Sequence, residues 1–340
     1  MPSRTVDANG NGLTVPTVGI IANPAAGKDI RRLVAQGRVV SNQEKSNILR
    51  RVFAGLQSHG VDKVVVMPDM AGLARSAMHD TQDELRSEFI DQTPTGSQND
   101  STVAARMMRD TGADCIVTLG GDGTNRLVAK GCGDVPLVPI STGTNNVFPK
   151  EIEGTLAGIA AATIAKNPRF RTDVCRQSKK IEVMVDGEVR DIALVDAAVS
   201  RQTMVGARAL WDVSTLQSVF LTRAEASSIG IASIGARLAL IEIDDPRGLY
   251  IRFPDPNQSG SDSLVAPIAP GMVKDVAIVD WRTIEPDELV GIEAARGTIA
   301  LDGEREIELL DGMRAAIRIN SDGPWVVDFD RALEAACADG

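Results

Sequence analysis

Short apolar runs alternate with helical patterns through the first half of the chain. Four compact apolar runs end in turns, as buried strands do: TVGIIANP (17–24), KVVVMPD (63–69), CIVTL (115–119) and PLVPI (136–140). Apolar residues recur at helical spacing in the segments 42–60, 70–78, 101–112, 125–131 and 154–168. A polar stretch, 79–100, interrupts the alternation. Strands that alternate with helices predict a parallel sheet in an α/β domain.

The pattern changes after residue 168. The segment 179–200 holds two apolar runs around Asp186-Gly187, which predicts a β-hairpin. Short strands with turn signals continue at 237–244, 248–253, 273–281, 297–310 and 315–320. We expect 211–227 to be a helical or irregular interruption, and 329–338 to be a closing helix. The second half is therefore predicted to be mostly antiparallel β.

The length of the chain agrees with this division. At 340 residues it exceeds one comfortable hydrophobic core, so two domains are expected. The patterns predict an α/β nucleotide-binding domain at 17–168 and a β-rich substrate domain at 169–325. The last segment, 326–340, is expected to return to the first domain.

Composition restricts the partners. The net charge of −10 argues against a nucleic-acid or anionic-membrane surface, because both select clustered Lys and Arg. The first 16 residues are polar and lack the apolar core of a signal peptide, and no apolar stretch reaches the length of a membrane span. We therefore expect a cytoplasmic protein with small-molecule partners.

Cysteine and histidine are too sparse for several kinds of site. The four cysteines form no C-x-x-C pair and are expected to be reduced thiols, with Cys115 buried in its strand. His59 and His79 are the two histidines, and both fit ordinary helix-end or surface positions. A Ser-His-Asp triad or a His-built zinc site is therefore disfavoured, and the chemistry must depend on carboxylates, amides and backbone groups.

Three strands of the predicted sheet end in polar, glycine-bearing loops: NPAAGK (23–28), GGDGTN (120–125) and STGTNN (141–146). Ligands of open parallel sheets bind beyond the carboxyl ends of the strands, so we expect these loops to converge on one crevice. Neither G-x-G-x-x-G nor a P-loop motif is present, which disfavours a NAD-dependent dehydrogenase or P-loop enzyme. Each loop could also be an ordinary turn or helix cap.

The GGDGTN loop has the residue types of a phosphate site. Glycines permit a positive φ and let a ligand approach the backbone closely, and amides at a strand-to-helix turn attract phosphate. Asp122 has the wrong charge for holding phosphate itself. Its carboxylate must perform chemistry, hold a metal ion or cap the following helix.

Together, NPAAGK, GGDGT, GTNN and the late LDGE (301–304) resemble the superfamily of NAD kinases and diacylglycerol-type lipid kinases. VGIIANPAAGKDIRRL and ISTGTNNVFP are similar to the branch of ATP-NAD kinase and acetoin-catabolism protein X, from about residue 17 to 330. The resemblance implies a Rossmann-like N-terminal domain with a parallel sheet and a C-terminal antiparallel β-sandwich, with substrate bound between them.

The resemblance also implies roles for individual residues. Asp122 would be catalytic, either activating the acceptor hydroxyl or organising Mg²⁺. Nucleotide and phosphate would contact Asn23, Lys28, Gly120, Gly121, Gly123, Thr124, Asn125, Thr144, Asn145 and Asn146. The substrate side would contain Asp196, Asp302 and Glu304.

Two positions depart from the NAD kinase pattern. Glu304 matches the lipid-kinase relatives, whereas NAD kinases usually carry an amide there. Val195 precedes Asp196 where NAD kinases carry an asparagine beside the acid that holds the dinucleotide. Asp186-Gly187-Glu188 repeats the D-G-E string but is predicted to be a hairpin turn.

The predicted function is ATP-dependent phosphoryl transfer to a hydroxyl of a small soluble acceptor, with NAD(H) giving NADP(H) as the first candidate. The expected cofactors are ATP, with polyphosphate as the other possible donor, and Mg²⁺ or Mn²⁺. The alternatives are a kinase of another small molecule or of a lipid, and a catalytically silent nucleotide-binding regulator linked to acetoin catabolism. A homo-oligomer, dimer or tetramer, is expected by analogy with such kinases.

Overall fold

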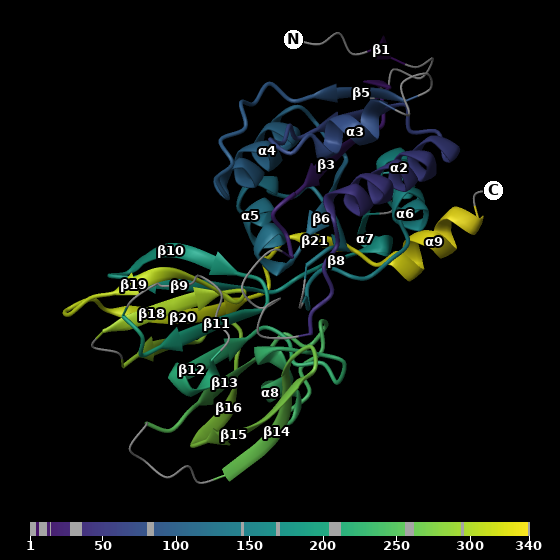
Figure 1. The fold of residues 1–340 in the computed structure, drawn as a ribbon. Coiled ribbons are helices and arrows are strands. Elements are labelled where there is room, and N and C mark those ends of the chain that lie inside the picture. Colours follow the sequence, from purple (N-terminus) through teal and green to yellow (C-terminus); the bar gives the residue numbers. More distant parts are fainter. Residues whose placement is uncertain are drawn as a thin grey trace.

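A computed structural model gives the fold of the chain (Figure 1). It describes residues 5–6, 12–13, 15–27, 36–79, 85–143, 146–167, 171–203, 212–255, 262–293 and 296–338. Two lobes are visible. We refer to the lobe around the parallel sheet as the first domain and to the lobe of antiparallel sheets as the second domain.

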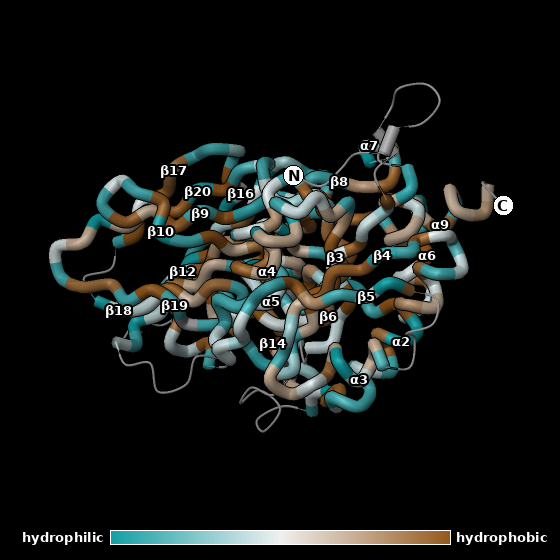
Figure 2. Tube along the Cα trace, turned by 90° about the horizontal axis from the view of Figure 1, so that it is seen from above, coloured by the Kyte–Doolittle hydropathy of each residue, from teal (hydrophilic) through white to brown (hydrophobic). Residues whose placement is uncertain are grey.

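A seven-stranded sheet forms the centre of the first domain, in the order β5-β4-β3-β6-β7-β21-β8. All neighbours pair in parallel except β21 and β8, which are antiparallel. The strands are β3 (Thr17–Ala22), β4 (Lys63–Val66), β5 (Arg86–Phe89), β6 (Cys115–Gly120), β7 (Leu137–Ser141), β8 (Cys175–Gln177) and β21 (Trp325–Val327). In Figure 2, β3 and β6 run as hydrophobic segments through this lobe, because helices cover both faces of the sheet.

Helices α2, α3, α6 and α9 pack on one face of the sheet, and α4 and α5 pack on the other. Their bounds are α2 (Asn42–Ser58), α3 (Leu73–His79), α4 (Asn99–Asp110), α5 (Asp122–Cys132), α6 (Gly154–Lys166), α7 (Arg171–Val174) and α9 (Phe329–Ala338). Gly55 and Gly158 let α2 and α6 meet backbone to backbone. A Cβ at Gly158 would lie 2.2 Å from the carbonyl oxygen of Val52. The expected closing helix is α9, and it packs back on α6 of the first domain.

The second domain contains two antiparallel sheets, in the orders β10-β9-β20-β17 and β16-β13-β12-β11-β18-β19. Their strands are β9 (Lys180–Val185), β10 (Glu188–Ala193), β11 (Asp196–Ser200), β12 (Leu216–Leu221), β13 (Gly248–Arg252), β16 (Asp280–Ile284), β17 (Leu289–Ile292), β18 (Gly297–Leu301), β19 (Glu304–Leu309) and β20 (Ala315–Asn320). Side chains from both sheets share one hydrophobic core. The fold class is thus confirmed as a Rossmann-like domain plus a β-sandwich.

Small elements complete the described chain. A separate hairpin, β14 (Asp262–Ala269) and β15 (Met272–Ile278), packs with helix α8 (Ile231–Ala236), and a 3₁₀ turn, η2 (Val213–Thr215), precedes β12. Two-residue strands β1 (Thr5–Val6) and β2 (Gly12–Leu13) pair near the N-terminus. Within the described residues, every helix falls short of the length and hydrophobicity that crossing a bilayer requires.

Three predictions of secondary structure are wrong. The polar stretch 79–100 contains β5, which is an edge strand paired with β4 and therefore lacks an apolar pattern. The segment 211–227 contains β12, a central strand whose two faces both enter hydrophobic cores, so no polar face reveals its period of two. The segment 237–244 is not a strand, and Ile241 makes an isolated bridge to Ala224. The Asp186-Gly187 turn is confirmed, with φ of 52° and 88°.

Candidate functional site

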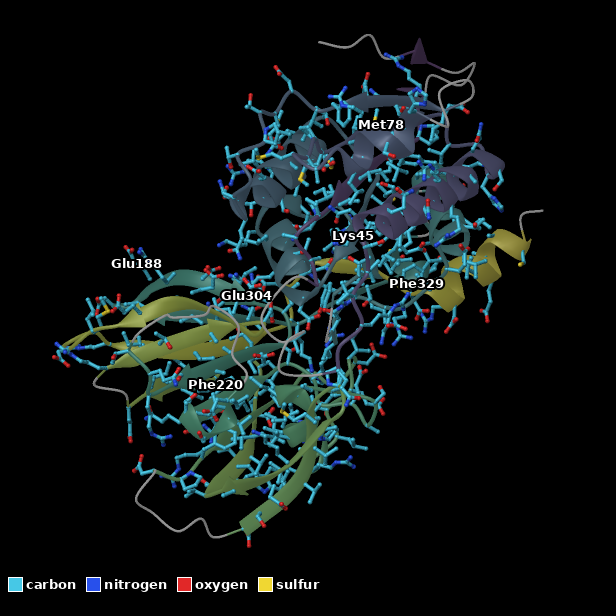
Figure 3. The ribbon with its side chains drawn as sticks, viewed as in Figure 1. Lys45, Met78, Glu188, Phe220, Glu304 and Phe329 are labelled. Carbon is cyan, nitrogen blue, oxygen red and sulfur yellow. The ribbon has the colours of Figure 1, made fainter. Side chains whose placement is uncertain are left out.

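A cleft of about 220 Å³ lies at the carboxyl edge of the parallel sheet, where the two domains meet. Residues 23–27, 121–124, 143 and 146 line it, so the three loops expected to converge do share one crevice. The second domain contributes Asp302 and Glu304. Figure 3 shows Glu304 at the junction of the two lobes.

Of the two reasons for glycines in the GGDGTN loop, a positive φ does not apply to Gly121, where φ is −101°. A Cβ at Gly121 would lie 2.8 Å from Oδ1 of Asn146. A Cβ at Gly120 would lie 2.4 Å from Cβ of Thr124. Both distances are shorter than an ordinary carbon contact, so a side chain at Gly120 would collide with the body of Thr124, whereas one at Gly121 would require the Asn146 side chain to move.

Asp122 is the first residue of α5 and is 8% exposed. Its Oδ1 accepts hydrogen bonds from the backbone amides of Val147 (3.1 Å) and Phe148 (2.8 Å), and its Oδ2 also accepts from Val147 (3.1 Å). Both carboxylate oxygens therefore hold the loop that follows β7. Asp122 lines the cleft as well, so it connects two of the three convergent loops.

Asn23 links the first loop to the second. Its Nδ2 donates to Oγ1 of Thr124 at 2.9 Å, and its Oδ1 accepts from the amide of Ala25 at 2.8 Å. Thr124 is buried and lines the cleft. The two side chains therefore fix the NPAAG turn against the start of α5.

A buried lysine that the sequence pattern did not reveal supports the same turn. The ammonium of Lys45, on α2, donates to the carbonyl oxygens of Asn23 (3.1 Å), Pro24 (3.2 Å) and Ala26 (2.8 Å). Figure 3 shows Lys45 within the first domain. Because three carbonyls converge on one ammonium, the curvature of residues 23–26 depends on this side chain.

The amide side chains predicted to contact nucleotide have different positions. Asn146 lines the cleft and donates from Nδ2 to Oγ of Ser141 at 2.8 Å. Asn125 is fully buried, where it accepts from Oγ1 of Thr118 at 2.6 Å and donates to the carbonyl of Gly121 at 2.9 Å. Asn125 therefore stabilises the strand-to-helix turn and does not line the cleft.

On the opposite wall, Asp302 occupies the turn between β18 and β19 with a φ of 51°. Its carboxylate accepts from the amides of Leu194 (3.0 Å), Val195 (2.7 Å) and Asp196 (3.2 Å). Burial raises the pKa of Asp302, while Arg126 and these amides oppose the shift. The side chain of Asp196 is buried on β11 and does not line the cleft.

A buried arginine feels the charges of both aspartates. Arg223 stacks over the ring of Phe148 at 5.4 Å and donates to Oγ of Ser178 at 3.1 Å. Burial lowers the pKa of Arg223, and the charges of Glu225, Asp122 and Asp302 oppose that shift. This cation therefore compensates the charge that Asp122 and Asp302 bring to the interior.

Glu304, the first residue of β19, reaches across the cleft. Its Oε2 accepts from Nε2 of Gln98 at 2.7 Å, and Gln98 directly precedes α4 in the first domain. Its Oε1 lies 3.6 Å from the place that a Cβ on Gly123 would take. A carboxylate of the second domain therefore lies beside the N-terminus of α5.

Two further cleft segments were missed by the predictions. Residues 67–70 follow β4, and residues 94–101 follow β5. In the first, Asp69 caps α3 by accepting from the amides of Leu73 (3.0 Å) and Ala74 (2.9 Å). The rule that strand ends line the site could have included 67–70, whereas the polar sequence of β5 concealed 94–101.

Lys28, Thr144 and Asn145 lie outside the described residues. Among the residues that the structure describes, no three His, Cys, Asp or Glu side chains are arranged to hold a metal ion. Cys115 is buried, as expected, and burial raises the pKa of its thiol.

Known proteins resemble both domains. Residues 18–167 match the model of the ATP-NAD kinase N-terminal domain, and residues 179–322 match the acetoin catabolism protein X C-terminal domain. Acetoin catabolism protein X of Cupriavidus necator is 37% identical over 303 residues, which cover 86% of this chain and 84% of that protein. A solved structure of a proposed diacylglycerol kinase from Bacillus anthracis is 12% identical with a TM-score of 0.43, covering 92% of this chain and 99% of that one. The resemblance seen in the sequence motifs is confirmed.

Proposed function

The chain belongs to the family of acetoin catabolism protein X, and from this premise we propose that it is an ATP-dependent phosphotransferase acting on a hydroxyl group of a small molecule. One observation carries the proposal: a cleft in which the start of α5 and the NPAAG turn face two carboxylates of the other domain. Phosphoryl transfer needs backbone donors, positioning and a carboxylate near the nucleophile more than it needs covalent catalysis.

The phosphates of ATP would lie at the N-terminus of α5, where amides and the helix dipole favour anions. Asp122 lies at that helix end, and its bonds to the amides of Val147 and Phe148 would order the loop after β7 around the nucleotide. Glu304 would approach from the acceptor side. Its carboxylate would then take the proton of the attacking hydroxyl.

The carboxylates in the cleft fit a magnesium ion that arrives with ATP. Mg²⁺ commonly keeps several waters and binds one or two carboxylates together with substrate phosphates, so a complete protein cage is unnecessary. Asp122, which lines the cleft at the start of α5, is the side chain that would hold it. When bound, the ion would neutralise charge on the phosphates.

NAD(H), giving NADP(H), is the first acceptor to test, because the first domain matches the model of ATP-NAD kinases. The position of Asp196 favours testing acceptors smaller than NAD(H) as well. In the NAD kinase pattern this acid would hold the dinucleotide, but its side chain lies outside the cleft lining. The name of the Cupriavidus relative adds acetoin and related ketols to the panel.

The test uses purified protein with ATP and Mg²⁺ against NAD, NADH, ketols, polyols and diacylglycerol vesicles, with products identified by mass spectrometry. We expect a phosphorylated acceptor and matching ADP release. Glu304→Gln should lower kcat by about 10²-fold or more, and Glu308→Gln, an exposed glutamate on the same strand, should not. ATP binding without transfer to any acceptor, with Mn²⁺ as well as Mg²⁺, would instead support a nucleotide-binding regulator.

A further inference from the structure

Arg126 connects the two domains beside the cleft. It lies one helical turn after Asp122 on α5, and it is 1% exposed. Its Nη1 donates to Oδ2 of Asp191 on β10 at 3.2 Å, and its Nη2 donates to Oε1 of Glu306 on β19 at 2.9 Å. One guanidinium of the first domain therefore binds one strand from each sheet of the second domain.

Both acidic partners lie at β-bulges. β10 and β19 are edge strands of different sheets. In β10 the extra residue is Arg190, directly before Asp191, and in β19 it is Glu306 itself. A bulge redirects side chains at a sheet edge and recurs next to functional sites. Two independent irregularities thus direct carboxylates to the same guanidinium.

The ion pairs also determine where Glu304 lies. Gly123 and Arg126 are three residues apart on α5, and Glu304 and Glu306 are two residues apart on β19. Arg126 holds Glu306, while Oε1 of Glu304 lies 3.6 Å from the place that a Cβ on Gly123 would take. The helix and the strand therefore meet at two adjacent points, and a slip at the first would displace the carboxylate at the second.

A buried ion cluster is a poor source of stability, because well-packed apolar residues would serve as well or better. Such clusters are better suited to fixing one geometry. We propose that Arg126 is a positioning residue, which sets the register of α5 against β19 and so holds Glu304 at the transfer site. This inference rests on the proposed function.

The matched control lies on the same helix. Lys130, one turn further along, also pairs with Asp191 on β10, at 2.9 Å, but its side chain is partly exposed. Arg126→Met should lower kcat by about 10²-fold, the scale expected for misplacement of a reacting group by 1 Å. The KM for ATP should stay within about threefold, because the nucleotide loops belong to the first domain. Lys130→Met should change kcat by less than about twofold, and Arg126→Lys should recover part of the loss.

Hydrogen–deuterium exchange gives a readout that needs no turnover. We expect Arg126→Met to increase exchange in 304–309 and 188–193, and Lys130→Met to leave 304–309 unchanged. If Arg126→Met does not fold, Glu306→Gln removes one partner and should lower kcat by about tenfold with an unchanged KM.

The outcomes separate the two proposals. If wild-type protein phosphorylates no acceptor, the proposed function fails, and the exchange pattern alone then decides whether Arg126 sets the register. If wild-type protein is active and a folded Arg126→Met variant retains its kcat, the positioning role is wrong. Equal losses in Arg126→Met and Lys130→Met would also overturn it, because they would indicate a general effect of charge.

Discussion

Asp122 and Asp302 face the same cleft from opposite domains, and each gathers consecutive backbone amides. Asp122 starts helix α5 and binds the loop after β7, whereas Asp302 occupies a hairpin turn and binds the turn between β10 and β11. Asp122 receives two amides and Asp302 receives three. The same carboxylate chemistry therefore organises a loop on each wall.

The two loops differ in the segments to which they connect. The loop that Asp122 holds continues to Asn146 and Gly143, which line the cleft. The turn that Asp302 holds continues into β11, a central strand of the six-stranded sheet. We infer that Asp122 mainly serves the chemistry of the cleft and that Asp302 mainly serves the stability of the second domain.

The largest expected effect is on turnover in Asp122→Asn. The amide oxygen can still accept a hydrogen bond from the loop, but the negative charge is lost. Because that charge would hold Mg²⁺ at the phosphates, we expect kcat to fall by about 10²–10³-fold, with ATP affinity within about threefold by calorimetry. Asp69→Asn is the matched control, because Asp69 also lines the cleft and caps a helix. An Asp122→Asn variant that turns over within threefold of wild type would remove Asp122 from the catalytic group.

The next effect is on the free energy of unfolding. Here we expect substitution of Asp302 to cost more than substitution of Asp122. Asp302→Ala leaves three buried amides without their acceptor, at about 1–3 kcal/mol for each unsatisfied donor. We expect a loss of at least about 3 kcal/mol in the free energy of unfolding, measured by urea denaturation. Asp122→Ala should lose less, because it frees two amides beside an open cleft that water can enter. Equal losses of unfolding free energy in the two variants would contradict the different roles inferred for Asp122 and Asp302.

The sequence indicated the two aspartates for reasons of different strength. GGDGT stands between a clear strand and a clear helix, so local pattern alone placed Asp122 at the edge of the sheet. Asp302 was identified by family resemblance. Its carboxylate accepts hydrogen bonds from the turn Leu194–Asp196, which lies at least 106 residues earlier in the chain. No local pattern records such a contact.

The supporting cations show the same limit. Lys45, Arg126 and Arg223 are fully or almost fully buried, yet each lies in a segment where a surface charge would be equally natural. Their partners come from other elements, so helical or strand periodicity does not distinguish them from exposed residues. The fold was largely predictable from periodicity, whereas the charge network that positions the site depends on tertiary contacts.

A smaller effect is expected when a side chain is added at Gly121, next to Asp122. In Gly121→Ala, the new Cβ would lie 2.8 Å from Oδ1 of Asn146, which must move. We expect ATP affinity to fall by about tenfold, measured by calorimetry, because the rearranged side chain lines the cleft. In an Asn146→Ala background the same change should cost much less. A full loss in that background would show that the Cβ collides with the nucleotide instead.

The smallest expected effect is a pH dependence that shows whether burial or hydrogen bonding dominates the pKa of Asp302. Burial raises the pKa of this carboxyl in the folded protein above its unfolded value of about 3.9. The folded state then retains a proton that the unfolded state has released, so stability is lost as pH rises from about 4 to the raised pKa. Asp302→Asn has no such titration. We therefore expect the difference in unfolding free energy, wild type minus Asp302→Asn, to increase as pH falls toward 4, with all other groups cancelling. A difference that decreases instead would mean that Arg126 and the three amides outweigh burial, and that Asp302 is held as an anion.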